Sequence, residues 1–483
     1  MSNSKNDNTK IKNRKSIFLN IIITTFATSA LATSLATALP AIMDDMHIHV
    51  TTARWLTSGY ILTMAIMMPL TAFFAKRVPT KRLYIAALVL FTLGLGGNVF
   101  APTFAIMMTS RILQAIGGGI LKSLGQMLIL YLYPEGKRGT AMGWYAFAMG
   151  AAPIIAPTVT GVLIDISSWR VFFYITIGAM LFSLVMAIYV FTDILDVHYY
   201  HFDVLSFVLS VFAFGGIVLG FGNGGKWDIV SWQVGGVFLI GFISGVFFVH
   251  RQVTIESPLL NMKLFHKNVM FVLAAFTVVM YHIVMYGSSL MLPLYVQNIR
   301  HESATISAFV LMPGAIMMTI LSPLLGRLYD RVGVHILLIS GGFFLAISTG
   351  LMYFSDLSTS LWLVAVVNMV RGAAQASLMS TLVTWAISAV QKSQTPDATA
   401  IVASLRSLST ATGSAVFIGI MDLVARESDL TGDMASMHGF NVSFGLMALP
   451  GFIIMGVGII VFVCDRKKRA SSSQNFIETN VGQ

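Results

Sequence analysis

Fourteen long runs of apolar residues, separated by short polar segments, dominate this chain of 483 residues. A bilayer core of about 30 Å is crossed by about 20 apolar residues in a helix, and each run is close to that length or longer. Charged residues make up 10% of the chain, whereas about a quarter is usual in a soluble domain, so lipid must be the solvent. The pattern predicts an all-α membrane protein with fourteen transmembrane helices, at residues 16–43, 52–75, 82–101, 104–132, 138–164, 170–192, 204–222, 232–250, 268–297, 303–326, 334–354, 358–388, 399–424 and 443–464.

Basic residues fall mostly on one side of this helix pattern. Of the 30 Lys and Arg residues, 21 lie on the side of the two termini, five lie on the opposite side and four lie within helices. The positive-inside rule therefore predicts a multi-pass protein of the cell (plasma) membrane with both termini in the cytoplasm. Only the loop at 193–203 departs from the pattern, because it holds acidic residues and no basic one. Topology accounts for the net charge of +10, so we expect no nucleic-acid partner.

Two segments of similar shape recur at corresponding places in the helix pattern. Gly326–Gly333 lies between the tenth and eleventh runs, Ala72–Pro79 lies between the second and third, and Arg111 and Arg371 follow in the fourth and twelfth. Parallel six-helix halves with a substrate site at their junction are a known transporter architecture. The repeat predicts two six-helix bundles with two helices inserted between them. The expected segments are a cytoplasmic tail at 1–15, a bundle at 16–192, the inserted helices and linkers at 193–267, a second bundle at 268–464 and a cytoplasmic tail at 465–483.

Several short motifs cover nearly the whole membrane part, in a consistent order and in consistent topological places. They are Arg111–Gln114 with Gly117–Gly119, Lys137–Gly143, Gly150–Gly161, Ser168–Arg170 with Phe172 and Phe173, Pro293–Arg300 and Leu311–Gly314. On these motifs the chain resembles the major facilitator superfamily, and specifically its fourteen-helix drug:proton antiporters of the lincomycin-export and multidrug type. The resemblance implies two bundles that rock about a central substrate site.

The segment after the tenth run resembles the cytoplasmic gate motif of that family, with Gly326, Asp330, Arg331 and Gly333 as its residues. Asp330 can neutralise the N-terminus of a neighbouring helix, and Arg331 can pair across the interface, which would hold the inner gate shut. The alternative is a tight turn that is charged because of the positive-inside bias. In the first copy Lys76 stands where the family often has Asp, and Pro79 stands where it has Gly, so we expect little gating from it.

Arg111 lies within an apolar run, where an unpaired charge is costly and a partner or a wet cavity is needed. The family resemblance implies a role in proton coupling for this arginine, and Gln114 lies on the same helical face. The alternative is a structural role in which Arg111 bonds backbone carbonyls.

The fifth run carries the antiporter signature of the family, at Gly143, Gly150, Pro153, Pro157 and Gly161. Proline removes a backbone hydrogen bond and bends a helix, while glycine permits close approach between helices. We expect a kinked helix against which the two halves rock. Plain packing of small residues is the alternative, and it is compatible with the first.

The acid that the family commonly has in its first helix is replaced here by Leu31, and no Asp or Glu lies deep in any predicted span. The deep charges are basic, at Lys122, Arg371 and Arg406 beside Arg111, and His282 is also deep. We expect His282, which can titrate near neutrality, or Asp165 at the outer end of its helix to carry the proton. A cavity with net positive charge should favour neutral or anionic amphipaths over cationic dyes.

These features predict a secondary active multidrug efflux transporter that exports small amphipathic molecules by alternating access, in exchange for protons. A transporter of a lipid, fatty acid or anionic metabolite is the alternative within the same class, and a non-transporting membrane sensor or binding protein is the alternative from another class. We expect a monomer embedded in membrane lipid.

Catalytic chemistry is not indicated. No nucleophile–base pair is visible, and Gly117–Ser123 lacks the glycine before lysine that a phosphate-binding loop needs. His47, His49, His198 and His201 have a spacing seen in metal sites, but loop histidines are usually solvated. We therefore expect no enzyme activity, no catalytic residue, no bound metal and no cofactor.

Overall fold

The computed structural model describes residues 13–53, 55–195, 197, 203–223, 231–255 and 258–481. Within these ranges the regular structure is entirely helical. The elements are α1 (Arg14–Met46), α2 (Val50–Ala53), α3 (Trp55–Arg77), α4 (Thr80–Val99), α5 (Phe104–Leu132), α6 (Glu135–Ile166), α7 (Arg170–Val190), α8 (Val204–Asn223), η1 (Trp232–Gly236), α9 (Val237–Thr254), α10 (Leu264–Lys267), α11 (Val269–Leu294), η2 (Tyr295–Ile299), α12 (Ala304–Val332), α13 (Val334–Tyr353), α14 (Leu361–Ser388), η3 (Lys392–Gln394), α15 (Thr395–Glu427) and α16 (Gly432–Val481).

The predicted fold class is confirmed by the lengths and compositions of these helices. In the described part, 13 helices are long and apolar enough to cross a membrane, and α8 adds a shorter apolar stretch at Val204–Gly220. The largest difference from the predicted spans is at 443–464, because α16 extends from Gly432 to Val481. Its first turns carry Asp433 and His438, which a search for apolar runs excludes although the helix has already begun.

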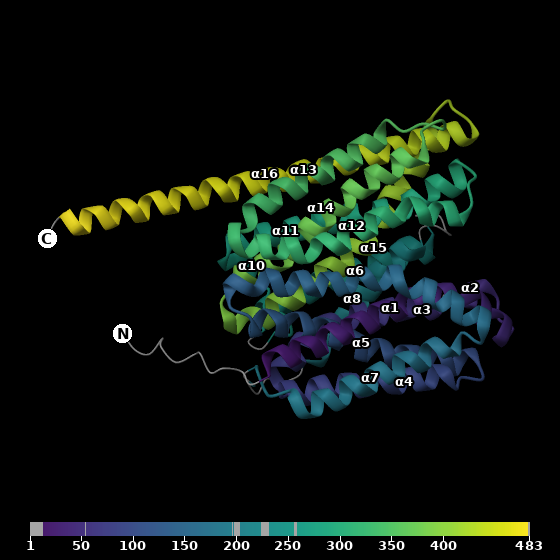
Figure 1. Ribbon diagram of the computed structural model, residues 1–483, viewed down its shortest axis with the longest axis horizontal. Coiled ribbons are helices and arrows are strands. Elements are labelled where there is room, and N and C mark those ends of the chain that lie inside the picture. The colour runs from purple at the N-terminus through teal and green to yellow at the C-terminus, as the bar shows by residue number, and fades with distance from the viewer. Residues whose placement is uncertain are drawn as a thin grey trace.

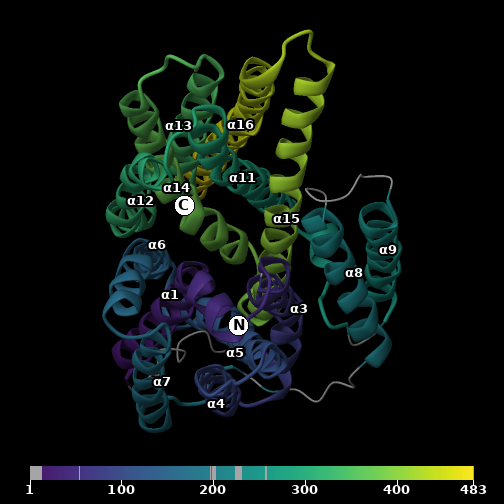
Figure 2. The ribbon, with the colours of Figure 1, turned by 90° about the vertical axis from the view of Figure 1, so that its right-hand side faces the viewer.

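The helices form two bundles with a pair of helices at one side (Figure 2). One bundle contains α1 and α3–α7, the other contains α11–α16, and α8 packs with α9 beside the place where α3 meets α15. We call the bundles the first half and the second half. The start of α1 and the end of α16 lie at the same end of the molecule (Figure 1), which we call the basic end.

The acidic segment after α7 departs from the charge pattern, but its described carboxylates have partners. Asp193 Oδ1 accepts a hydrogen bond from the backbone N–H of Lys81, in the first turn of α4, at 3.0 Å. Asp203 forms an ion pair with Arg251, at 2.6 Å. His198 and His201, in the same segment, lie outside the described residues.

The two halves approach each other most closely where α6 crosses α12. A Cβ atom on Gly139 would lie 2.5 Å from the carbonyl oxygen of Gly326, and one on Gly143 would lie 2.5 Å from that of Ser322. Side chains at these glycines would therefore separate the helices. Gly161 is on the same face of α6, about five turns beyond Gly143, yet a Cβ there would meet nothing within 4 Å. The close approach that these glycines permit is therefore found near the basic end.

Candidate functional site

Arg111 is buried inside the first half, where its side chain is 1% exposed. Its Nη1 donates to Oε1 of Gln114 at 2.7 Å, and its Nε donates to the backbone carbonyl of Leu56 at 3.2 Å. The guanidinium also lies over the ring of Tyr60, 4.3 Å from the centroid. These contacts fasten α5 to α3. The hydrogen bond to the carbonyl of Leu56 is the kind that the structural alternative for Arg111 predicts. Its part in proton coupling stays a prediction.

Arg371 has an equivalent setting inside the second half. Its Nε and Nη2 donate to Oδ1 of Asn368 at 2.9 and 2.6 Å, and its Nη1 donates to Oγ of Ser288 at 2.5 Å. Asn368 in turn donates to backbone carbonyls of α12. The side chain of Arg371 is 7% exposed, so this cation, expected among the cavity charges, is held within its own half.

Lys122 and Arg406 differ from these two arginines because they come from opposite halves and keep accessible surface. Lys122 lies on α5 and Arg406 on α15, ten and eleven residues from the basic ends of their helices. At 1.5 Å per residue, both sit about 15–17 Å below the basic end. They are close enough for their charges to repel. Among the described residues, neither takes part in an ion pair.

His282 is buried beside Arg406, at a similar depth in α11. Its Nδ1 lies 2.8 Å from the carbonyl oxygen of Val278, and its Nε2 lies 3.1 Å from Nε of Arg406. A carbonyl can only accept and a guanidinium can only donate, so the proton belongs on Nδ1 and Nε2 is the acceptor. The arrangement therefore fits a neutral histidine.

Arg406 also reaches across to the first half. Its Nη1 lies 3.5 Å from Oε1 of Gln126, a long hydrogen bond between α15 and α5. Next to it, Oγ of Ser407 lies 3.1 Å from the sulfur of Met68 on α3. Gln126 was not among the predicted site residues, although its position four residues after Lys122 places both on one helical face.

The carboxylate of Asp330, at the end of α12, binds the second turn of α6. It accepts from the backbone N–H groups of Gly139 and Thr140 at 2.8 and 2.7 Å, and from the hydroxyl of Thr140 at 2.6 Å. A carboxylate near a helix N-terminus is favoured by the helix dipole. This contact joins the two halves at the basic end.

A second contact between the halves involves Lys76, at the end of α3. Its Nζ lies 2.5 Å from Oδ1 of Asp397, in the first turn of α15. The same oxygen accepts from the backbone N–H of Asn261 at 3.3 Å. Asp397 was not among the predicted site residues, although an acid directly after Pro396 at a helix start is a visible signal in the sequence. Our expectation of little gating from Lys76 did not include this partner.

Arg138 supplies a third contact at the basic end. Its Nη1 donates to the hydroxyl of Ser388, at the end of α14, at 3.2 Å, while its Nε donates to the carbonyl of Leu130 at 3.0 Å. The first half is therefore tied to α12, α14 and α15 on this side.

The residues of the antiporter signature on α6 fall into two groups with different surroundings. Gly143 and Gly150 face α12, because a Cβ on Gly150 would lie 2.9 Å from Oγ1 of Thr319. Pro153 is exposed and Pro157 is partly exposed. Gly161 faces open space. The glycines near the basic end provide the contact with α12, and the two prolines follow them along α6.

The remaining predicted site residues lie apart from these contacts. Arg331 is exposed, and within the described residues its side chain has no hydrogen bond or ion pair, so the expected pairing across the interface is not formed. Gly333 ends α12 with a φ of 81°, a backbone conformation that favours glycine. Asp165 is exposed near the opposite end, in the last turn of α6.

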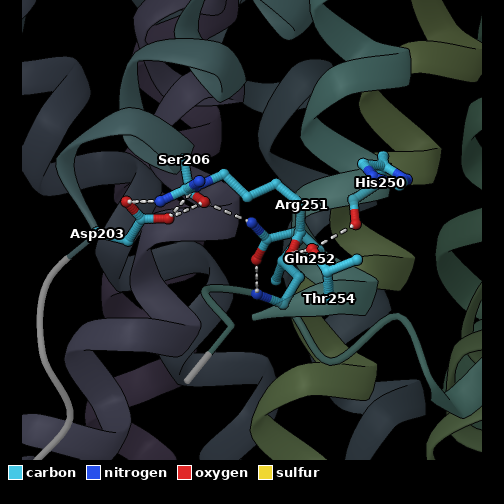
Figure 3. Close-up of polar contacts among 7 residues, drawn as sticks. Asp203, Ser206, His250, Arg251, Gln252 and Thr254 are labelled. Atoms are coloured by element: carbon cyan, nitrogen blue, oxygen red, sulfur yellow. Dashed lines mark hydrogen bonds and ion pairs between the residues drawn. The ribbon is translucent and has the colours of Figure 1, made fainter. Parts of the chain in front are cut away.

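A polar network fastens the inserted helices at the basic end (Figure 3). Asp203, just before α8, accepts from Nε and Nη2 of Arg251 at 2.6 and 3.0 Å and from Ser206 at 2.5 Å. These hydrogen bonds lower the pKa of Asp203 to about 2. Gln252 donates to Ser206 and accepts from the backbone N–H of Leu260 at 3.1 Å. The network leads into the segment that reaches Asp397 through Asn261.

Comparison with known proteins places the chain in a family. The model of the Major Facilitator Superfamily matches residues 21–201 and 199–414. The uncharacterized MFS-type transporter YcnB of Bacillus subtilis is 33% identical over 457 residues, which are 92% of this chain and 96% of YcnB. The lincomycin resistance protein LmrB of the same organism is 31% identical over 419 residues, covering 84% of this chain and 85% of LmrB.

Solved structures agree with this assignment at the level of the fold. The human organic anion transporter MFSD10 superimposes with a TM-score of 0.62 at 12% identity, covering 92% of this chain and 98% of its own. The proton:xylose symporter XylE gives a TM-score of 0.61 at 15% identity, covering 90% and 94%. The chain is thus a multi-pass membrane transporter and not an enzyme. It belongs to the major facilitator superfamily, within the fourteen-helix drug:proton antiporter family that its motifs resemble.

Proposed function

We propose that this protein exports small amphipathic molecules from the cytoplasm by alternating access, in exchange for protons. Support comes from relatives named for lincomycin resistance and from the multidrug transporter protein MdtP of Bacillus subtilis, which is 27% identical over 73% of this chain. The charge pattern supports a cytoplasmic location for the basic end and for both termini, in the cell membrane.

The observation that carries this proposal is the closure of the basic end by contacts between the halves. Asp330 binds α6, Lys76 binds Asp397, and Arg138 binds Ser388. A Cβ on Gly161, toward the opposite end of α6, would by contrast meet nothing within 4 Å. This asymmetry is that of a transporter closed on one side, and export requires the same contacts to break so that the basic end opens.

His282 is the residue that we propose to carry the proton. In the basic-end-closed state its Nε2 accepts from Arg406, so a proton on Nε2 would place two donors face to face. Protonation of His282 would therefore release Arg406, whose Nη1 reaches Gln126 in the other half. Proton entry and the contact between the halves are coupled through this arginine.

Asp165 is the second proposed proton carrier, because its exposed position near the opposite end gives it direct contact with solvent. Arg111 and Gln114, which fasten α5 to α3, would act on coupling by holding the first half rigid while the proton moves.

The test is transport into everted membrane vesicles from a drug-sensitive bacterial host that expresses this protein. A neutral amphipathic fluorophore and lincomycin serve as substrates, with an imposed proton gradient and with a protonophore. The proposal expects gradient-dependent accumulation that the protonophore abolishes. Equal accumulation with and without the gradient would contradict proton exchange.

The role of His282 has its own control. His282→Gln removes the titrating group from the interior, and His250→Gln removes an exposed histidine of α9. Gradient-dependent transport is expected to be lost in the first variant and kept in the second. Transport that stays coupled to protons in His282→Gln would shift the role to Asp165, for which Asp165→Asn is the matching variant.

A further inference from the structure

We propose that Lys122 and Arg406, assisted by Gln126, form a binding site for the anionic group of an amphipathic substrate. The inference rests on the proposed function and adds to it the charge class of the transported molecule. A carboxylate or a sulfonate is the headgroup that such a site fits, because ionised oxygens are the strong partners of ammonium and guanidinium groups.

The four interior cations fall into two classes. Arg111 and Arg371 are 1% and 7% exposed, and each has neutral acceptors within its own half. Lys122 has no hydrogen bond or ion pair from its ammonium group within the described residues, and Arg406 has only a neutral imidazole and a distant amide. Arg111 and Arg371 therefore have their hydrogen-bond acceptors without a ligand, whereas Lys122 and Arg406 do not.

The incomplete pair lies where a substrate would bind. Lys122 comes from α5 of the first half and Arg406 from α15 of the second, and the contact of Arg406 with Gln126 shows that the two faces meet there. Both residues are partly exposed although they lie deep in their helices. An anion between them would contact both halves at once.

Electrostatics favours an external counter-ion at this point. A charged side chain in the interior of the membrane is costly unless it is paired or hydrated. Two neighbouring cations add mutual repulsion to that cost. The described residues place no carboxylate against either cation. A bound anion would therefore reduce both the cost of the unpaired charges and the repulsion between them.

The surroundings of the pair are partly apolar, which suits an amphipath better than a small inorganic anion. Met68 contacts Ser407, the residue next to Arg406, and methionine adapts to varied shapes. Tyr145, whose hydroxyl donates to the backbone carbonyl of Lys122 at 3.2 Å, is buried against the same turn of α5.

The experiment uses three probes that share one fluorophore and differ in charge: dansylglycine (anionic), dansylamide (neutral) and dansylcadaverine (cationic). Transport of each is measured in everted vesicles, and binding of each is measured on the purified protein. Wild-type protein should prefer the anionic probe over the cationic one by about 10- to 100-fold, as expected for a charged hydrogen bond.

Variants then locate that preference. Lys122→Gln and Arg406→Gln should each weaken binding of the anionic probe to the purified protein by about tenfold or more and leave binding of the neutral probe within about twofold. Transport is compared only for Lys122→Gln, because Arg406 also takes part in the proposed proton coupling. Arg426→Gln removes an exposed charge from the same helix as Arg406 and should change nothing. Lys122→Glu combined with Arg406→Gln should transfer the binding preference to the cationic probe, a gain that misfolding cannot produce.

The outcomes separate this inference from the proposed function. Wild-type protein that handles the cationic probe as well as the anionic one overturns the inference, even if proton-driven transport of the neutral probe stands. A Lys122→Gln variant that keeps the full anionic preference also overturns it. Selective binding of the anionic probe without gradient-driven transport of any probe would support the site and contradict proton-coupled export.

Discussion

The ammonium group of Lys76 lies 2.5 Å from a carboxylate oxygen of Asp397 and joins the end of α3 to the first turn of α15. Asp330 makes the corresponding contact from the end of α12 to the second turn of α6. In the repeat, α3 corresponds to α12 and α15 corresponds to α6. The carboxylate therefore lies at the end of α12 in one contact and in the first turn of the receiving helix α15 in the other, and the closure of the basic end keeps a two-fold arrangement.

Reversing the charges of the Lys76–Asp397 pair should test this arrangement. Lys76→Asp and Asp397→Lys should each weaken the basic-end-closed state, and the double variant should recover most of the loss. The coupling energy should be about 1 kcal/mol, since the pair is largely buried but Lys76 remains partly exposed. Initial transport rates of the wild type, the two single variants and the double variant give the double-mutant cycle. Arg82→Asp, at an exposed position nearby, is the control, and a double variant no better than the worse single one would contradict the pair.

Asp330→Ala should open the basic end, because it removes the acceptor for three hydrogen bonds from α6. The closed state should lose about 2 kcal/mol. A cysteine at buried Ala141, in a Cys464→Ser background, should then react faster with a soluble thiol reagent. Arg331→Ala changes the next residue, which has no partner within the described residues, and should leave the labelling rate unchanged. Equal effects from both variants would remove the special role of Asp330.

Gly143 and Gly161 lie on one face of α6 and should respond differently to the same methyl group. Gly143→Ala places a Cβ 2.5 Å from the carbonyl of Ser322, and overpacking of this kind costs about 1–3 kcal/mol. Gly161→Ala places it in open space and should be nearly neutral. Thermal unfolding and transport rates of the two variants provide the comparison. A larger loss at Gly161 would show that α6 and α12 touch along their whole length in the resting protein.

Asp203 should make the stability of the inserted helices depend on pH. Its pKa falls from near 4 to about 2 on folding, mainly because of the hydrogen bonds from Arg251. A lowered pKa stabilises the folded state above the unfolded value, and this contribution is lost as the pH falls from about 4 to about 2. Asp203→Asn should therefore lower the melting temperature at pH 7, and its difference from wild type should shrink in acid. Asp429→Asn, at an exposed loop position, should show neither effect.

The fourteen spans and their order could be predicted because burial in lipid imposes a length and an apolar composition that survive in the sequence. The interior cations could be found in the same way, since a charge in an apolar run stands out. Their division into Arg111 and Arg371 on one side and Lys122 and Arg406 on the other could not, because it depends on which direction each side chain takes and on contacts with distant helices. Asp397 had a signal in the sequence, an acid directly after Pro396, but its partner Lys76 lies on a distant helix and could not be predicted.

The central claim is that the halves move about the contact of α6 with α12, so that one end opens as the other closes. Paired spin labels measure this directly in a Cys464→Ser background, with one pair at Arg82 and Arg331 on the basic end and the other at Ser167 and Asp429 on the opposite end. When a transported substrate is added to the reconstituted protein at different pH values, the first distance should lengthen while the second shortens. Distances that stay fixed, or that change in the same direction at both ends, would contradict the account.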